Sequence, residues 1–150
     1  MIAVVQRVKR VSVTVEEKIV GSCGMGYVIL LGVANGDTEK DAEVLAVKLA
    51  KLRIFEDENE KMNRSILDMG GEALVVSTFT LLANYSHGNR PEYLAAAAPA
   101  EANRLYEYFC AELSRTIPHV GRGVFGADMR VEIIGDGPVT IVMDSKVLIK

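Results

Sequence analysis

The sequence predicts a single α+β domain in which a layered, mixed β-sheet forms a sandwich or barrel and two main helices pack outside it. Three observations favour this class. About seven stretches of strand character accompany only two strong helical stretches. Tyr27–Val33 is wholly apolar, which is typical of a central strand with both faces buried. Residues 1–150 contain no linker and no internal repeat, and this length suits one domain.

The first half of the chain is expected to hold three strands and a helix. Residues 2–15 alternate loosely between apolar and polar side chains, and residues 19–22 form a second, short strand. The glycines that follow precede a strand rather than a helix, so they do not form a phosphate-binding loop. A helix begins at Thr38, with Asp41 as its capping-box partner, and its apolar face ends at Leu52.

The second half is expected to hold a helix and four strands. The helix begins at Pro99, a residue suited to the first helical turn, and ends before Pro118. Gly135–Pro138 is expected to turn between the last two strands. The strands are placed at residues 73–79, 122–125, 129–134 and 139–143. Polar loops or turns are placed at residues 56–63, 68–71 and 83–91.

Composition and charge exclude several classes of protein. The net charge of −3 and a pI near 5.4 argue against a non-specific nucleic-acid binder, which would carry a basic footprint. The longest apolar run is too short to span a bilayer, and the first residues lack the apolar stretch of a signal peptide. We therefore expect a cytoplasmic protein without a membrane partner. Cys23 and Cys110 match no zinc or redox spacing and are expected to be buried thiols.

The common catalytic motifs are missing. The chain has no GxSxG elbow, no HExxH and no Walker loop. His87 and His119 lie in polar loops and are expected to be solvated, and the acidic run at residues 56–60 indicates a wet loop rather than a metal site. A Ser–His–Asp triad on Ser77 stays open, although nothing in the sequence supports it.

Two segments invite a chemical interpretation. Ser77–Leu81 places three hydroxyl side chains at the end of a strongly apolar strand, where they and exposed backbone amides could face a bound ester. The alternative is a strand edge whose threonines follow β propensity. Gly137–Pro138 lies between two expected strands, and proline confines it to a strand start or edge. An ordinary turn is the alternative there.

With their neighbours, these segments resemble the D-aminoacyl-tRNA deacylase family over essentially the whole chain. The resemblance is carried, in this order, by Ala3–Val8, Lys61–Asn63, Ser77–Leu81, Asn89–Pro91, Phe125–Met129 and Asp136–Thr140. The chain departs from the family pattern twice. Thr78 stands where the family has Gln, and Gly135 stands where it has Asn. Both departures concern side-chain amides and leave the backbone pattern intact.

The resemblance implies that a homodimer binds the 3′ end of aminoacyl-tRNA and hydrolyses the ester bond of D-aminoacyl-tRNA and glycyl-tRNA(Ala), with no cofactor and no metal. It assigns the catalytic site to Ser77, Thr78, Phe79 and Thr80. Backbone N–H groups near Phe79 and Thr80 would stabilise the oxyanion. Thr80 would act as nucleophile or orient water, and we favour assistance by the 2′-hydroxyl of the substrate.

The resemblance also implies a second group of site residues. Gly137 and Pro138 would form a cis peptide and project into the active site of the other protomer, where their carbonyls leave no room for an L side chain. Arg7 is expected to hold these carbonyls through its donor fork, and a solvated strand charge is the alternative. The candidate cations for the tRNA surface are Lys9, Arg10 and Arg90.

Two other functions stay open. A related editor with relaxed chirality would have a trans Gly137–Pro138 bond and would remove a mischarged L-amino acid. A non-catalytic module that binds tRNA or protein would keep the fold without the activity, and Thr78 in place of Gln is its support.

Overall fold

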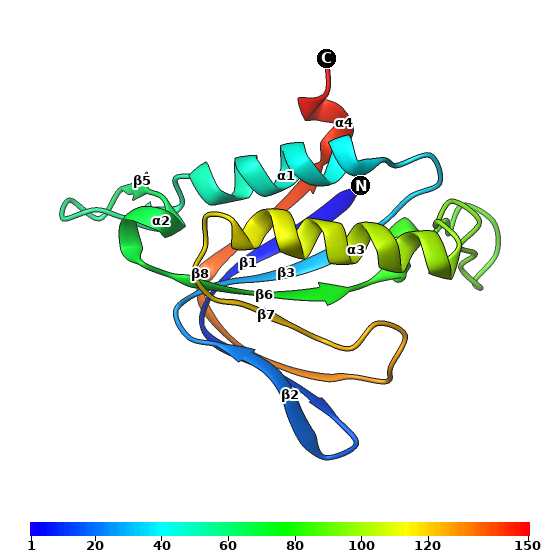
Figure 1. Ribbon diagram of the computed structural model, residues 1–150, viewed down its shortest axis with the longest axis horizontal. Coiled ribbons are helices and arrows are strands. Elements are labelled where there is room, and N and C mark those ends of the chain that lie inside the picture. The colour runs from blue at the N-terminus through cyan, green and yellow to red at the C-terminus, as the bar shows by residue number, and fades with distance from the viewer.

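The long first strand organises the fold. In the computed structural model, which describes residues 1–150, β1 (Ile2–Val15) pairs along one edge with β8 (Arg130–Asp144). Along its other edge it pairs first with β3 (Gly26–Gly32) and then with β2 (Lys18–Cys23). One alternating strand thus belongs to both halves of a strongly curved sheet (Figure 1).

The sheet is mixed and curls toward a barrel. β6 (Glu72–Ser77) pairs parallel with the apolar β3, and β7 (Val120–Arg122) pairs parallel with β6. β2 lies against β7 because Gly21 has no side chain, and a Cβ there would overlap the carbonyl oxygen of Arg122. This contact nearly closes the barrel. The predicted α+β class, with its mixed sheet and outer helices, is confirmed.

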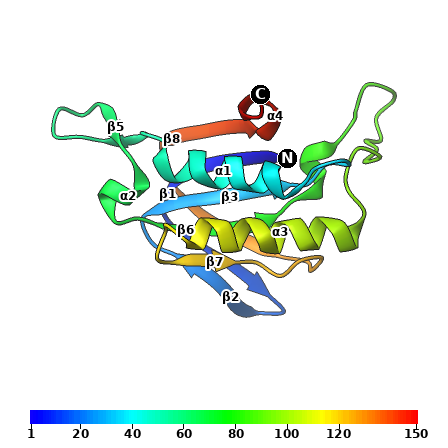
Figure 2. The same cartoon turned by 45° about the horizontal axis from the view of Figure 1, so that its top comes forward.

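Two helices cover one face of the sheet. α1 (Glu39–Lys51) and α3 (Pro99–Ser114) lie side by side on that face (Figure 2). Both were predicted, and each buries the apolar stripe read from the sequence. The short helices α2 (Ile66–Met69) and α4 (Ser145–Leu148) were not predicted, because four residues are too few to show a helical period. None of the helices is long and apolar enough to cross a membrane.

The sheet separates two hydrophobic cores. Side chains such as Tyr27, Leu45 and Phe109 fill the space between the sheet and the two long helices. Seven residues form a second core inside the barrel, namely Val8, Val11, Val13, Cys23, Val28, Leu74 and Val76. Because β3 and β6 contribute to both cores, β3 is apolar along its length and β6 is apolar from Ala73 to Val76.

The turn predicted at Gly135–Pro138 is wrong. Residues 130–144 form one continuous strand, because β1 pairs with β8 on both sides of this segment. Two register shifts, between Gln6 and Val8 and between Val8 and Arg10, accommodate it. Gly137 and Pro138 therefore lie on a strand edge and are exposed, and the peptide bond between them is cis.

Other boundaries also differ from prediction. The polar loop expected at residues 56–63 contains a two-stranded ribbon, β4 (Phe55–Glu56) and β5 (Met62–Arg64). The turn expected at 68–71 is the end of α2, which Gly70 closes in the left-handed conformation. The strand expected at 73–79 ends at Ser77, and the one expected at 122–125 lies at 120–122.

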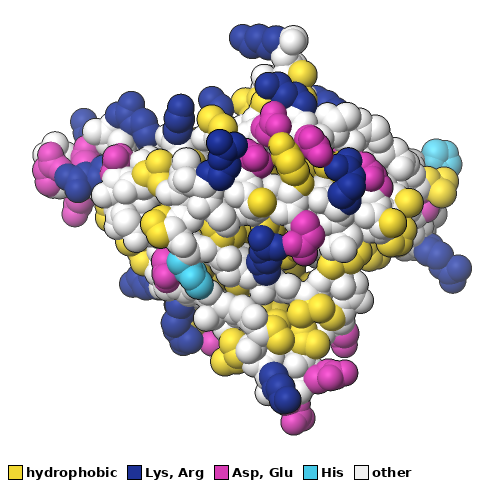
Figure 3. Space-filling model, viewed as in Figure 1, with side chains coloured by type: hydrophobic (Ala, Val, Ile, Leu, Met, Phe, Trp, Pro, Cys, Tyr) yellow, Lys and Arg dark blue, Asp and Glu magenta, His cyan; other side chains and the backbone are white.

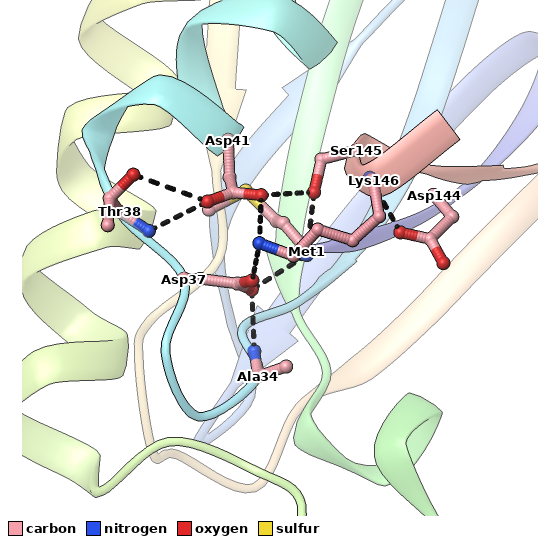
Figure 4. Close-up of polar contacts among 8 residues, drawn as sticks. All are labelled: Met1, Ala34, Asp37, Thr38, Asp41, Asp144, Ser145 and Lys146. Carbon is pink, nitrogen blue, oxygen red and sulfur yellow. Dashed lines mark hydrogen bonds and ion pairs between the residues drawn. The ribbon is translucent and has the colours of Figure 1, made fainter. Parts of the chain in front are cut away.

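A buried polar cluster joins α1 to β1 and α4 (Figure 4). Asp41 accepts hydrogen bonds from the Thr38 N–H at 2.8 Å and from Lys146 Nζ at 2.7 Å. Asp37 Oδ2 lies 2.7 Å from the Met1 ammonium group, which also donates to Ser145 Oγ at 2.9 Å. Asp41, which the sequence predicted as the capping-box partner at the start of α1, thus also anchors α4.

Candidate active site

The predicted hydroxyl segment lies where β6 ends. Thr78 N–H donates to Leu31 O at 2.8 Å, which carries the parallel pairing with β3 one residue past the strand. The chain then turns into the 3-10 helix η1 (Phe79–Leu82). Gly32 lets this turn pack closely on β3, because a Cβ there would lie 3.1 Å from the carbonyl oxygen of Thr78. Phe79 and Thr80 therefore begin a helical turn, whereas the sequence placed Phe79 in a strand.

The start of η1 presents backbone donors. The Leu81 N–H closes the first turn by donating to Thr78 O at 3.3 Å. The N–H groups of Phe79 and Thr80 precede it and have no partner within the turn. The Thr78 hydroxyl is occupied, since it donates to Val76 O at 3.1 Å. Phe79 and Thr80 are both exposed residues.

An apolar pocket of about 510 Å³ opens beside η1. Phe79 forms one wall and meets Tyr93 edge to face, with ring centroids 5.1 Å apart. Ser77 and Phe125 also line the pocket, and small residues from 96 to 98 leave room in it. Figure 3 shows apolar side chains gathered below α3 and toward the end of the molecule where α3 begins. The volume suits a nucleoside or another small organic group.

The pocket holds no side chain that acts as an acid or base near neutral pH. Its lining contains neither carboxylate, imidazole, thiol nor amine, and Ser77 and Tyr93 supply its only side-chain hydroxyls. His87 and His119 are exposed elsewhere, as predicted. Both cysteines are buried, as predicted, and burial raises the pKa of each to about 12, so neither is a nucleophile at neutral pH. The pocket can therefore bind and orient an ester, and a proton must be moved by water or by the ligand.

The other predicted group surrounds Arg7. This guanidinium is 6% exposed and donates to Ile54 O at 2.8 Å and to Asp136 O at 3.0 Å. Its alternative role as a solvated strand charge is wrong. The carbonyl that it holds belongs to the residue before Gly137, whereas the sequence named the carbonyls of Gly137 and Pro138 themselves. Arg7 thus fixes the backbone that leads into the exposed pair.

The segment Ser77–Thr80 and the second group, Arg7 with Gly137 and Pro138, do not meet within one chain. Ser77 pairs with Leu31, which pairs with Ala3, whereas Arg7 lies four residues further along β1. Gly137 lies near the level of Arg7 on β8, three strands across from β6. Strand geometry separates the two groups by roughly 20 Å. The pocket walls at Tyr93 and at residues 96–98 carried no chemical signal in the sequence, because aromatic and alanine residues are common in any core.

Comparisons with known proteins agree with this architecture. The family model described as D-Tyr-tRNA(Tyr) deacylase matches residues 4–144. A D-aminoacyl-tRNA deacylase of Ruegeria pomeroyi is 55% identical over 96% of this chain and 99% of its own. One from a Sulfurihydrogenibium species is 55% identical over 99% of this chain and 100% of its own.

Two solved structures share the fold. One, titled c-Myc DNA unwinding element binding protein, superposes with a TM-score of 0.90 at 41% identity over 96% of this chain and 98% of its own. A probable eukaryotic D-amino acid tRNA deacylase superposes with a TM-score of 0.80 at 16% identity, over 95% and 98% of the two chains, which shows the shared fold alone. The curated relatives that match this chain are deacylases, which are a class of hydrolases. The chain belongs to the D-Tyr-tRNA(Tyr) deacylase family.

Proposed function

We propose that the protein hydrolyses the ester bond of D-aminoacyl-tRNA and of glycyl-tRNA(Ala) in the cytoplasm. The observation that carries this proposal is the apolar pocket of nucleoside size, which Phe79 of η1 lines and beside which the first two N–H groups of η1 have no partner within the turn. The terminal adenosine occupies the apolar volume, and the ester carbonyl points to the amides of Phe79 and Thr80. The full-length likeness to deacylases supports the same substrate.

The chemistry follows from the groups present. Water adds to the ester carbonyl carbon, and the amides of Phe79 and Thr80 stabilise the resulting oxyanion, at about 3 kcal/mol for each such donor. The bond from carbon to the ribose oxygen then breaks, and that oxygen takes a proton. Since no basic side chain lines the pocket, the neighbouring 2′-hydroxyl of the substrate relays the proton. Thr80 orients the water, and Ser77 binds the substrate.

Chirality is read by exclusion. Gly137 and Pro138 are exposed and lie roughly 20 Å from the pocket of their own chain, so they serve the pocket of a second protomer in a symmetric dimer. Their carbonyls, fixed through Arg7 and Asp136, occupy the space that an L side chain needs. Glycine has no side chain to clash, so glycyl-tRNA passes the same filter.

The substrate test compares the two enantiomers. Purified protein is incubated with D-tyrosyl-tRNA, L-tyrosyl-tRNA and glycyl-tRNA(Ala), and release of the amino acid is timed. We expect rapid hydrolysis of the D-tyrosyl and glycyl esters and at least a hundredfold slower hydrolysis of the L-tyrosyl ester, since about 2.7 kcal/mol of steric clash suffices. Equal hydrolysis of both enantiomers contradicts the proposal, and so does inactivity toward all three.

A further inference from the structure

A hairpin projects beyond the end of the sheet, next to the pocket (Figure 2). It joins η1 to α3, and its tip comprises residues 85–91. Asn84 and Glu92 form its base by exchanging two backbone hydrogen bonds, of 2.8 and 3.0 Å. Tyr93, the residue after this base, packs against Phe79 in the pocket wall. The hairpin therefore starts at the rim of the pocket.

The hairpin is tied down at its base. Asn35, in the loop between β3 and α1, donates its side-chain amide to Leu94 O at 2.8 Å and its backbone N–H to Ala95 O at 2.9 Å. The Glu92 carboxylate accepts the Leu94 N–H at 2.7 Å. Within the tip, Ser86 N–H donates to Asn84 Oδ1 at 3.1 Å. These bonds fix the base of the hairpin, and one of them reaches its tip.

The surface of this hairpin has unusual chemistry for a solvent-exposed loop. Tyr85 is 80% exposed and Leu94 is 82% exposed, so two large apolar side chains have no cover within the protomer. Arg90 is exposed and forms no ion pair, and the nearby Glu92 carboxylate is occupied by a backbone N–H. An aromatic ring and a free guanidinium on one hairpin tip are the groups that bind single-stranded RNA, by stacking on bases and by pairing with phosphates.

We infer that this hairpin binds the unpaired nucleotides that precede the terminal adenosine of the tRNA. The inference rests on the proposed function, because a terminal adenosine in the pocket forces the preceding nucleotides across the rim. Tyr85 stacks on one of their bases, and Arg90 pairs with a phosphate. A small contact of this kind accounts for how a protein with a net charge of −3 binds a polyanion.

Two substrates separate this contact from catalysis. D-tyrosyl-tRNA carries the preceding nucleotides, whereas 3′-O-D-tyrosyl-adenosine carries only the group that enters the pocket. We expect Tyr85→Ala to raise KM for the tRNA by about 5- to 100-fold, the effect of losing one stacked base, with kcat within about twofold. Its KM for the adenosine ester stays unchanged. Tyr85→Phe, which keeps the ring, behaves like the wild type.

The contribution of the Arg90 charge is tested separately. Arg90→Gln raises KM for D-tyrosyl-tRNA and lowers the salt dependence of log KM by about one unit of slope. Lys48→Gln, at an exposed cation of α1 that forms no ion pair, is the matched control and leaves both quantities unchanged. Sedimentation of every variant shows whether it has kept the wild-type oligomeric state.

Several results would overturn the inference. They are an unchanged KM for the tRNA in Tyr85→Ala, an equal loss on both substrates, or dissociation of the Tyr85→Ala variant into monomers, which would make the hairpin a protein interface.

A binding experiment gives a readout that does not depend on hydrolysis. The binding of a short single-stranded RNA that ends in CCA is measured by fluorescence anisotropy. Loss of this binding in Tyr85→Ala supports the hairpin contact even if the wild type proves inactive, so the two proposals fail separately.

Discussion

Arg7 shows how much structure one buried cation can organise. Its guanidinium joins the carbonyl of Ile54 to the carbonyl of Asp136, and it lies 3.4 Å from Asp136 Oδ2 and 6.0 Å from the Phe55 ring centroid. A fork of fixed N–H groups can hold two carbonyls at once, whereas a single ammonium cannot match that geometry. Arg7 therefore acts as a positioning residue for the Gly137–Pro138 edge.

We predict that Arg7→Lys lowers the ratio of kcat/KM for D-tyrosyl-tRNA to kcat/KM for L-tyrosyl-tRNA by about tenfold, which corresponds to ~1.4 kcal/mol. The reason is that the carbonyl of Asp136 loses its fixed donor and the exclusion of the L side chain loosens. Arg10→Lys is the matched control, because Arg10 lies on the same strand but is 65% exposed in its pair with Glu132. An unchanged ratio in Arg7→Lys would show that Arg7 only stabilises the fold.

Among the elements, α1 carries Asp41 in its first turn, where this residue both caps the helix and binds α4. Burial, the largest single influence on Asp41, opposes its ionisation, but hydrogen bonds from Lys146, Ser145 and Thr38 together hold its pKa below the ordinary value. The hydrogen bond to Asp41 in turn raises the pKa of Lys146. The carboxylate thus caps the helix and ties down α4 most strongly while it is charged.

We predict that Asp41→Asn lowers the free energy of unfolding by about 2–3 kcal/mol at pH 7, less than for a fully buried pair because Lys146 is 57% exposed. Since folding depresses the pKa of Asp41, its contribution is complete above about pH 4, the unfolded value, and is lost as the pH falls through the folded value. Urea unfolding should therefore show the difference from wild type shrinking below pH 4. Asp128→Asn, at an exposed residue, is the control. A difference independent of pH would contradict this linkage.

For the whole molecule, the separation of the two residue groups has the largest consequence. The register of four strands separates Phe79 from Pro138 by roughly 20 Å, so the proposed site that includes both residues would need a second protomer. In the symmetric dimer that we propose, the edge of one protomer would reach the pocket of the other, and symmetry would repeat the contact.

We predict that a mixture of Phe79→Cys and Pro138→Cys protomers is cross-linked to twice the protomer mass by a short bis-maleimide reagent. The native cysteines are buried and react slowly, so either variant alone gives little product. The measurement is denaturing electrophoresis after mixing and reannealing of the two variants. Failure to cross-link the mixture, or a double variant that cross-links only within one chain, would contradict the cross-subunit arrangement.

The sequence alone determined the elements whose periodicity is long. The alternating β1, the apolar β3 and the stripes of α1 and α3 were predictable because each pattern repeats over many residues. The motifs around Ser77 and Gly137 indicated the family for the same reason, since their order and spacing extend over the whole chain. Local patterns misplaced the continuous β8 and the end of β6, because only pairing with a neighbour decides where a strand stops.

Tertiary structure alone decided which of these residues can work together. Strand register puts Arg7 and the Gly137–Pro138 edge three strands across the sheet, and several residues along it, from the η1 pocket. It also brings Tyr93 to Phe79 and leaves Tyr85 uncovered. Sequence patterns report the environment of each residue along the chain. Register, curvature and side-chain packing set the distances between residues that are far apart in the sequence, and the geometry of the site depends on those distances.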